Sequence, residues 1–122
     1  MALIRALIAD DEVDSAEVFA EFLKLKNIDV VGLGKNGLEA VDLYEKHKPD
    51  VVFLDLMMPQ HDGFYAVEKI KEINPDANVM ILTAFYTDDM KKKLKSFGVD
   101  TIFEKPYSIK KIANILKAKD KA

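Results

Sequence analysis

Short apolar runs alternate along this chain with longer segments in which apolar residues recur at helical spacing. The apolar runs cover residues 3–9, 28–33, 51–54, 78–82 and 101–103. Three of them are almost wholly apolar, as expected for strands that are buried on both faces of a parallel sheet. The pattern therefore predicts five strands that alternate with five helices.

The segments between the strands carry apolar residues three and four positions apart, which places them on one face of a helix. The clearest stripes are Ala16, Phe19, Ala20 and Leu23; Met90, Leu94 and Phe97; and Ile109, Ile112, Ala113 and Leu116. Helix starts are indicated by N-cap and capping-box residues, namely Asp14 with Glu17, Asn36 with Glu39, Asp62, Thr87 and Ser108. Helix ends are indicated by the breakers Pro49, Pro75 and Gly98.

This order of elements predicts an α/β fold, a doubly wound parallel sheet with right-handed crossovers and helices on both faces. The length of 122 residues fits one domain. No repeat, low-complexity stretch or long linker interrupts the pattern. We therefore expect one domain spanning residues 1–122.

The composition is that of a globular protein, with 49% hydrophobic and 32% charged residues. The chain contains no cysteine, which excludes disulfides and thiolate metal sites and suits a reducing compartment. The apolar start is too short for a secretory signal and runs directly into acidic residues. No apolar run approaches the roughly 20 residues of a membrane helix. We expect a soluble, cytoplasmic protein that does not bind membranes.

Charge is distributed unevenly along the chain. Residues 1–89 carry 18 acidic and 8 basic side chains, whereas residues 90–122 carry 3 acidic side chains and 10 lysines. Such asymmetry can mark a surface for an oppositely charged partner, and it can equally be a solvated lysine face. Both interpretations stand at this level.

Polar residues stand at the carboxyl ends of four of the predicted strands. They are Asp10-Asp11-Glu12, Asp55, Thr83-Ala84 and Glu104-Lys105-Pro106. In open α/β sheets, ligands bind beyond the carboxyl ends of the strands, where the strand order reverses. We therefore expect these residues to meet in one pocket.

A pocket of carboxylates is unfavourable by itself, because like charges at short range disfavour ionisation. Mg²⁺ relieves that repulsion, since it takes oxygen ligands from carboxylates and phosphates and keeps several waters. With Mg²⁺ bound, Asp55 can act as a nucleophile and form an aspartyl phosphate. The Thr83 hydroxyl and the Lys105 ammonium can hold phosphoryl oxygens, and phosphoryl transfer needs little beyond such positioning and charge neutralisation.

Each of these residues also has an ordinary explanation. Asp10 and Asp11 can form a solvated turn. Thr83 can be a strand-end residue, and Lys105 one surface lysine among many. The ordinary account needs a coincidence at each of four strand ends, which favours the functional interpretation.

The same segments resemble the motifs of response-regulator receiver domains. They are Ile8-Ala9-Asp10-Asp11-Glu12, Val52-Phe53-Leu54-Asp55-Leu56-Met57-Met58-Pro59 with Asp62-Gly63, Ile81-Leu82-Thr83-Ala84, and Glu104-Lys105-Pro106. The resemblance covers essentially the whole chain, in order and spacing. It implies the flavodoxin-like strand order 2-1-3-4-5, which is taken here from the family.

The resemblance also implies a phosphoacceptor role for Asp55, with a sensor histidine kinase, a phosphotransfer protein or a small phosphodonor as the source. Mg²⁺ would be held by Asp11, Asp55 and the backbone carbonyl of Met57, and Asp10 would assist through water. Such a domain is a switch that catalyses only its own phosphorylation and dephosphorylation, rather than an enzyme.

The family pattern gives roles to other strand-end residues as well. Thr83 and Lys105 would hold the phosphoryl oxygens, the small Ala84 would leave the site accessible, and Pro106 matches a position where receivers usually have a cis peptide bond. A protein partner would bind the face formed by helix four, strand five and helix five. Direct binding of nucleic acid is not expected, because no reading motif is present.

One position departs from the family pattern. Three residues before the motif lysine, receivers commonly carry a Tyr or Phe ring that turns inward on activation, and this chain carries Ile102. Phe103 is aromatic, but adjacent residues of a strand point to opposite faces. The usual aromatic readout is therefore in question, whereas the phosphorylation chemistry is not.

A second motif offers a different function. Gly32-Leu33-Gly34-Lys35-Asn36-Gly37 matches the G-x-G-x-x-G fingerprint of dinucleotide-binding folds, between a predicted strand and a predicted helix. That fingerprint belongs at the first strand of its unit, however, and here a strand with its own acidic cluster comes earlier. A nucleotide-binding module would also leave Asp10, Asp11, Thr83 and Lys105 without a role.

Overall fold

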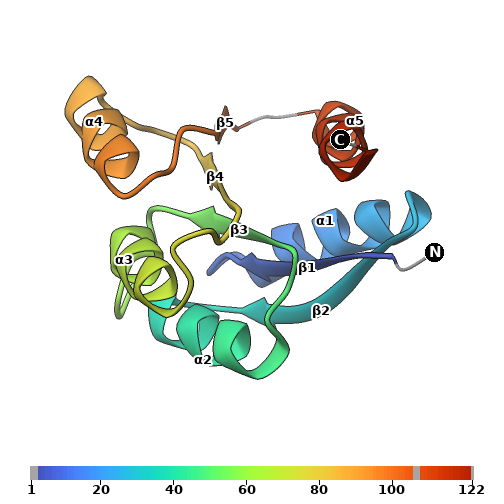
Figure 1. Cartoon of the computed structure of the whole chain (residues 1–122), viewed down its shortest axis with the longest axis horizontal. Helices are drawn as coiled ribbons and strands as arrows, with labels where there is room; N and C mark the ends of the chain where they lie inside the picture. The colour runs from blue at the N-terminus through green and yellow to red at the C-terminus, as the bar shows by residue number, and fades with distance from the viewer. Residues whose placement is uncertain (1–2, 106–107, 122) are drawn as a thin grey trace.

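The computed structural model describes residues 3–105 and 108–121. One parallel sheet has the strand order β2-β1-β3-β4-β5 (Figure 1). The strands are β1 (Ile4–Ala9), β2 (Ile28–Gly34), β3 (Val51–Asp55), β4 (Val79–Thr83) and β5 (Ile102–Glu104). The helices are α1 (Val13–Leu25), α2 (Gly37–His47), α3 (Gly63–Ile73), α4 (Asp88–Ser96) and α5 (Ile109–Lys121). The predicted fold class and strand order are confirmed.

The helices cover the sheet on both faces. Helices α1 and α5 lie on one face, and α2, α3 and α4 lie on the other (Figure 1). Side chains alternate along the buried strands, so that Val52 and Leu54 of β3 join the α2–α3 cluster while Val51 and Phe53 join the α1–α5 cluster. Strands with two buried faces must be apolar throughout, which explains the continuous apolar runs of the sequence.

Most of the predicted helix caps are present. Asn36, Asp62 and Thr87 each accept a hydrogen bond from a backbone N–H of the following first turn. Ser108 accepts one from the Lys111 N–H at 3.2 Å. Gly98 follows the end of α4 with a φ of 85°, the left-handed conformation that glycine adopts without steric cost.

The predicted capping box of Asp14 and Glu17 is wrong. Helix α1 begins at Val13 with Glu12 in the cap position, and Glu12 makes no side-chain cap hydrogen bond. The Glu12 N–H instead donates to the Asp10 carboxylate, which turns the chain early and starts the helix ahead of Asp14. Asp14 therefore lies inside the first turn, where its negative charge interacts favourably with the positive end of the helix dipole.

Strand ends also differ slightly from the prediction. Gly34, Asp55 and Thr83 are the last residues of their strands rather than the first residues of the loops. Among the described helices, none combines the length and apolar character that a membrane span requires.

Candidate functional site

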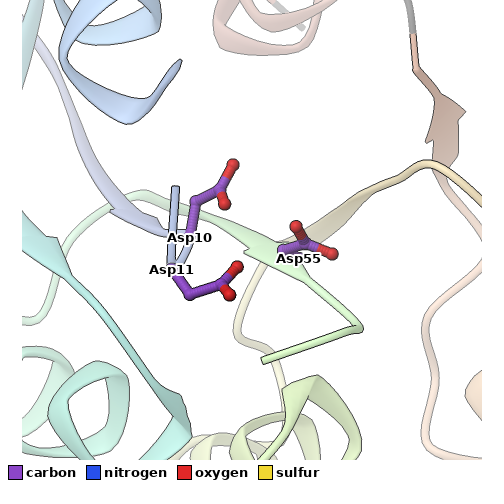
Figure 2. Close-up of side chains that lie close together, drawn as sticks. All are labelled: Asp10, Asp11 and Asp55. Atoms are coloured by element: carbon purple, nitrogen blue, oxygen red, sulfur yellow. The ribbon is translucent and has the colours of Figure 1, made fainter. Parts of the chain in front are cut away.

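Three carboxylates meet at the carboxyl ends of β1 and β3. Figure 2 shows Asp10 and Asp11, which follow β1, facing Asp55 at the end of β3. One oxygen from each of the three carboxylates lies within 4.8 Å of the other two. Asp10 and Asp55 are buried, whereas Asp11 is exposed at the mouth of the pocket.

The two buried carboxylates are oriented by the backbone that follows them. Asp10 Oδ1 accepts a hydrogen bond from the Glu12 N–H at 2.9 Å. Asp55 Oδ1 accepts one from the Met57 N–H at 3.0 Å. Each aspartate thus bonds to the residue two positions on, a local turn that its short side chain favours. One oxygen of each carboxylate is fixed in this way and the other is directed into the pocket.

Lys105 joins the two aspartates from the end of β5. Its Nζ lies 3.1 Å from Asp10 Oδ2 and 3.1 Å from Asp55 Oδ2. The backbone N–H of Lys105 also donates a hydrogen bond to the Thr83 carbonyl oxygen at 2.7 Å, which connects the start of the loop after β5 to the end of β4. The pocket therefore holds three carboxylates and one ammonium group.

Burial and charge shift two pKa values in this pocket. The pKa of Asp55 is raised, because burial disfavours the carboxylate more than the Met57 N–H and Lys105 favour it. Burial lowers the pKa of Lys105, but its hydrogen bonds and charge interactions with Asp10 and Asp55 outweigh burial and raise it overall. The pocket thus keeps Lys105 charged and makes the Asp55 carboxylate energetically costly.

Thr83 is fully buried at the end of β4. Its Oγ1 donates a hydrogen bond to the Phe85 carbonyl oxygen at 3.0 Å and lies 3.4 Å from the Phe85 nitrogen. The hydroxyl is thus engaged with the loop between β4 and α4. The sequence identified Thr83 but did not specify this hydrogen bond.

The pocket fits a hard divalent cation. Its donors are carboxylate oxygens close enough to share one ion, and one lysine leaves their negative charge incompletely compensated. Mg²⁺ and similar ions prefer such oxygen donors. The predicted ligand role of the Met57 carbonyl stays a prediction, and Pro106 lies outside the described residues.

Ile102 and Phe103 point to opposite faces of the sheet, as the sequence predicted. Ile102 packs against the cluster formed with α2, α3 and α4, and Phe103 packs against the cluster formed with α1 and α5. The only ring of β5 therefore lies on the face away from α4. An inward-turning ring on the α4 side is not available in this strand.

The glycine motif does not form a dinucleotide site here. Strand β2 lies at one edge of the sheet and is not the central first strand to which the fingerprint belongs. The Gly37 N–H, at the start of α2, donates to the His61 carbonyl oxygen at 2.5 Å. The loop between β3 and α3 therefore lies where a pyrophosphate would approach that helix terminus.

The comparisons with known proteins agree with this geometry. The family model described as the response regulator receiver domain matches residues 6–117. The chain belongs to the response-regulator receiver domain family. This receiver is 39% identical over 107 residues to the transcriptional regulatory protein PdtaR of Mycobacterium tuberculosis, covering 86% of the chain and 51% of that protein. It is 30% identical over 103 residues to the chemotaxis protein CheY of Halobacterium salinarum, covering 84% of the chain and 85% of that protein.

Solved structures show the same fold. A CheX–CheY complex with BeF₃ and Mg²⁺ from Borrelia burgdorferi gives a TM-score of 0.88 at 25% identity, covering 96% of this chain and 89% of the other. The receiver domain of a DNA-binding response regulator from Colwellia psychrerythraea gives 0.84 at 31% identity, covering 98% and 99%. The chain spans about half the length of the mycobacterial relative.

Proposed function

We propose that residues 1–122 form a phosphoacceptor switch in which Asp55 takes up a phosphoryl group with the help of Mg²⁺. One observation carries the proposal. The Asp55 carboxylate is buried at the end of β3, shares a pocket with Asp10 and Asp11, and is bonded to Lys105. No other described cluster of acidic side chains has this arrangement.

Asp11, Asp55 and the Met57 carbonyl would hold the ion, with Asp10 assisting through water. When bound, Mg²⁺ supplies positive charge that offsets the carboxylates and the incoming phosphoryl oxygens. The oxygens of Asp10 and Asp55 that face the pocket are the ones now bonded to Lys105. Lys105 therefore compensates the pocket's charge and is already in place to meet a phosphoryl oxygen.

The chemical step is nucleophilic attack by an Asp55 carboxylate oxygen on phosphorus. A new O–P bond forms as the bond between phosphorus and the donor's leaving atom breaks, and the donor keeps that electron pair. Thr83 must turn its hydroxyl away from the Phe85 carbonyl to donate to a phosphoryl oxygen. Phosphorylation would thus release a bond that now holds the loop between β4 and α4.

The domain is a switch rather than an enzyme because the group that reacts is its own side chain. Two states of the β4–α4 loop, with Thr83 bonded to Phe85 or to the phosphoryl group, would give the two signalling states. Because β5 has Ile102 rather than an aromatic side chain on this face, the conformational change between the two signalling states runs mainly through Phe85 and Tyr86.

The pocket's surroundings favour a protein phosphodonor. Val13, Met57 and Phe85 are large apolar side chains from three different segments near the strand ends, and they are 42%, 62% and 61% exposed. Exposed apolar side chains around a polar site are typical of protein contact surfaces. They support transfer from a histidine kinase or a phosphotransfer protein.

The downstream partner would bind the face of α4, β5 and α5. The exposed lysines of this face are Lys91, Lys92, Lys93, Lys95, Lys110 and Lys111. Lys93 lies with its Nζ 4.6 Å from the centre of the Phe64 ring, whereas the others extend from the helices without an ion pair among those described. Such a face suits an acidic protein partner.

The test is mass spectrometry of the intact chain after incubation with acetyl phosphate and Mg²⁺. The wild type should gain one phosphoryl mass, and Asp55→Asn should not. Asp29→Asn, at an exposed aspartate of the edge strand β2, is the matched control and should be modified like the wild type. Equal modification of Asp55→Asn and the wild type would place the phosphoacceptor elsewhere.

A further inference from the structure

The glycine-rich turn that follows β2 contacts both segments that form the acidic pocket. This β2–α2 turn comprises residues 34–37. At its start, the Gly34 carbonyl oxygen accepts a hydrogen bond from the Asp10 N–H at 3.0 Å. At its end, the Gly37 N–H donates to the His61 carbonyl oxygen at 2.5 Å. One short turn therefore bonds to the end of β1 and to the loop that follows Asp55.

Gly37 leaves no room for a side chain at this contact. A Cβ on Gly37 would overlap the His61 carbonyl oxygen and would lie 2.5 Å from the Asp62 carbonyl oxygen. Both neighbours are backbone atoms, which cannot move aside as the end of a flexible side chain can. The close approach of α2 to the loop thus depends on glycine at this position.

The loop that Gly37 contacts holds an unfavourable backbone conformation. Gln60 and His61 have positive φ values of 53° and 68°. The left-handed region is unfavourable for a non-glycine residue, so surrounding contacts must hold these residues there. The Gly37 hydrogen bond to His61 is one such contact, made at the tip of the loop.

The other end of the loop is fixed next to Asp55. The Gly63 N–H donates to the Leu56 carbonyl oxygen at 3.1 Å, and a Cβ on Gly63 would overlap the Asp55 carbonyl oxygen. Met57 lies between the two fixed points, with its N–H bonded to Asp55 Oδ1. A shift of the loop tip would therefore be transmitted to the segment that orients Asp55 and carries the Met57 carbonyl.

We infer that Gly37 is a positioning residue for the metal site, acting through the β3–α3 loop, and that the glycine motif serves this purpose instead of nucleotide binding. The inference rests on the proposed function, because it takes Asp55 and the Met57 carbonyl as metal ligands. Gly37 touches neither the ion nor the phosphoryl group. It holds the loop in the conformation that presents those ligands.

Gly34 provides a matched control within the same turn. A Cβ on Gly34 would lie 3.3 Å from the Ala40 nitrogen and 3.4 Å from Glu39 Cβ, so alanine fits there with a small adjustment. Its contact with Asp10 is made by the backbone carbonyl, which alanine retains. Gly34→Ala thus adds the same methyl group to the same turn without displacing the loop.

The experiment compares Mg²⁺ binding by isothermal titration calorimetry in the wild type, Gly37→Ala and Gly34→Ala. Gly37→Ala should bind Mg²⁺ at least about tenfold more weakly, the usual effect of losing support behind metal ligands. Gly34→Ala should stay close to the wild type. In the metal-free proteins, amide hydrogen exchange of residues 56–62 should be faster in Gly37→Ala only.

If Gly37→Ala folds poorly, a second variant separates stability from positioning. His61→Gly lets the loop adopt new φ values, so Gly37→Ala with His61→Gly should fold while still binding Mg²⁺ weakly, and His61→Gly alone should bind it like the wild type. Wild-type affinity in Gly37→Ala, or in the double variant, would overturn the inference. A wild type that does not bind Mg²⁺ would instead overturn the proposed function.

Discussion

Asp55 combines two properties that oppose each other in the metal-free protein. Burial raises its pKa, whereas the Met57 N–H and Lys105 favour the charged form without cancelling the effect of burial. A buried carboxylate whose negative charge is only partly compensated is stabilised when a metal ion binds beside it. It also loses that charge when phosphorylation converts it into an acyl phosphate. The same arrangement reduces the stability of the resting protein.

We therefore expect Asp55→Asn to stabilise the metal-free protein at pH 7. Because the pKa of Asp55 is higher in the folded state, the folded state binds the proton more tightly, and the free energy of unfolding falls as pH rises from the ordinary aspartate pKa of about 4 through the raised value. The cost is therefore present at pH 7, and asparagine removes it. Thermal unfolding in EDTA should show a higher Tm for the variant.

The gain should shrink as the pH is lowered from the raised pKa toward about 4, because the folded wild-type protein takes up the Asp55 proton at a higher pH than the unfolded chain does. Asp29→Asn, at an exposed position, should show no such pH-dependent gain. A lower Tm for Asp55→Asn than for the wild type at pH 7 would mean that the bond to Lys105 outweighs burial.

Asp11 is the exposed member of the carboxylate cluster, and its removal should separate metal binding from folding. Asp11→Ala should keep or slightly raise the metal-free Tm, because one of three like charges is removed. Mg²⁺ at about 100 times its dissociation constant should stabilise the wild type by about 2.7 kcal/mol. The variant should lose most of that gain at the same Mg²⁺ concentration, as measured by thermal unfolding with and without Mg²⁺. An unchanged response would exclude Asp11 as a ligand.

At the scale of single elements, α4 is the helix with the least apolar attachment to the sheet. Leu94 is its only buried residue, and four of its nine residues are lysines. Its start is fixed by the Thr87 side chain, which accepts a hydrogen bond from the Met90 N–H at 3.1 Å. A weakly attached helix that follows the Thr83–Phe85 loop is well placed to change position between signalling states.

Thr87→Ala should therefore destabilise the protein by about 1 kcal/mol through loss of the N-cap. Thr87→Ser retains the accepting oxygen and should restore most of the stability. Urea unfolding should show a lower midpoint for the alanine variant with an unchanged slope. Equal midpoints for Thr87→Ala and the wild type would mean that α4 is held by its packing alone.

Across the whole molecule, the acidic and basic regions of the sequence lie on different parts of the fold. The acidic cluster lies at the strand ends, and the lysine-rich segment forms α4 and α5 at the far side of the sheet from β2 (Figure 1). The site that receives the signal and the face proposed to pass it on thus differ in charge. The two surfaces would select partners of different character.

If the lysine face binds an acidic partner, its association should weaken with salt, because exposed charges are screened. Lys91→Glu with Lys92→Glu should reduce partner capture by the phosphorylated protein in a pull-down. Lys24→Glu with Lys46→Glu changes the net charge equally on α1 and α2, at exposed positions, and should leave capture intact. Capture that survives both the α4 reversal and high salt would make the lysine face a solvated surface.

The sequence by itself determined the fold class and the identity of the pocket residues. Strands buried on both faces must be apolar throughout, and parallel strands bring their carboxyl ends to one edge, so the order of residues along the chain is enough to predict that Asp10, Asp55 and Lys105 meet. The ion pairs from Lys105 to Asp10 and Asp55 confirm that juxtaposition. These features follow from local patterns and from the geometry common to all such sheets.

Only the tertiary structure decided the contacts that depend on the path of the loops. Examples are the bond from Thr83 to Phe85, the early start of α1 and the close approach of Gly37 to His61. Each of these features involves backbone atoms, and the residue types along the chain do not specify which partners backbone atoms will find. The same glycine spacing that suits a pyrophosphate in one fold suits a neighbouring loop in this one. What separates the two is which segment the sheet order brings against the start of α2, and that is a property of the assembled chain.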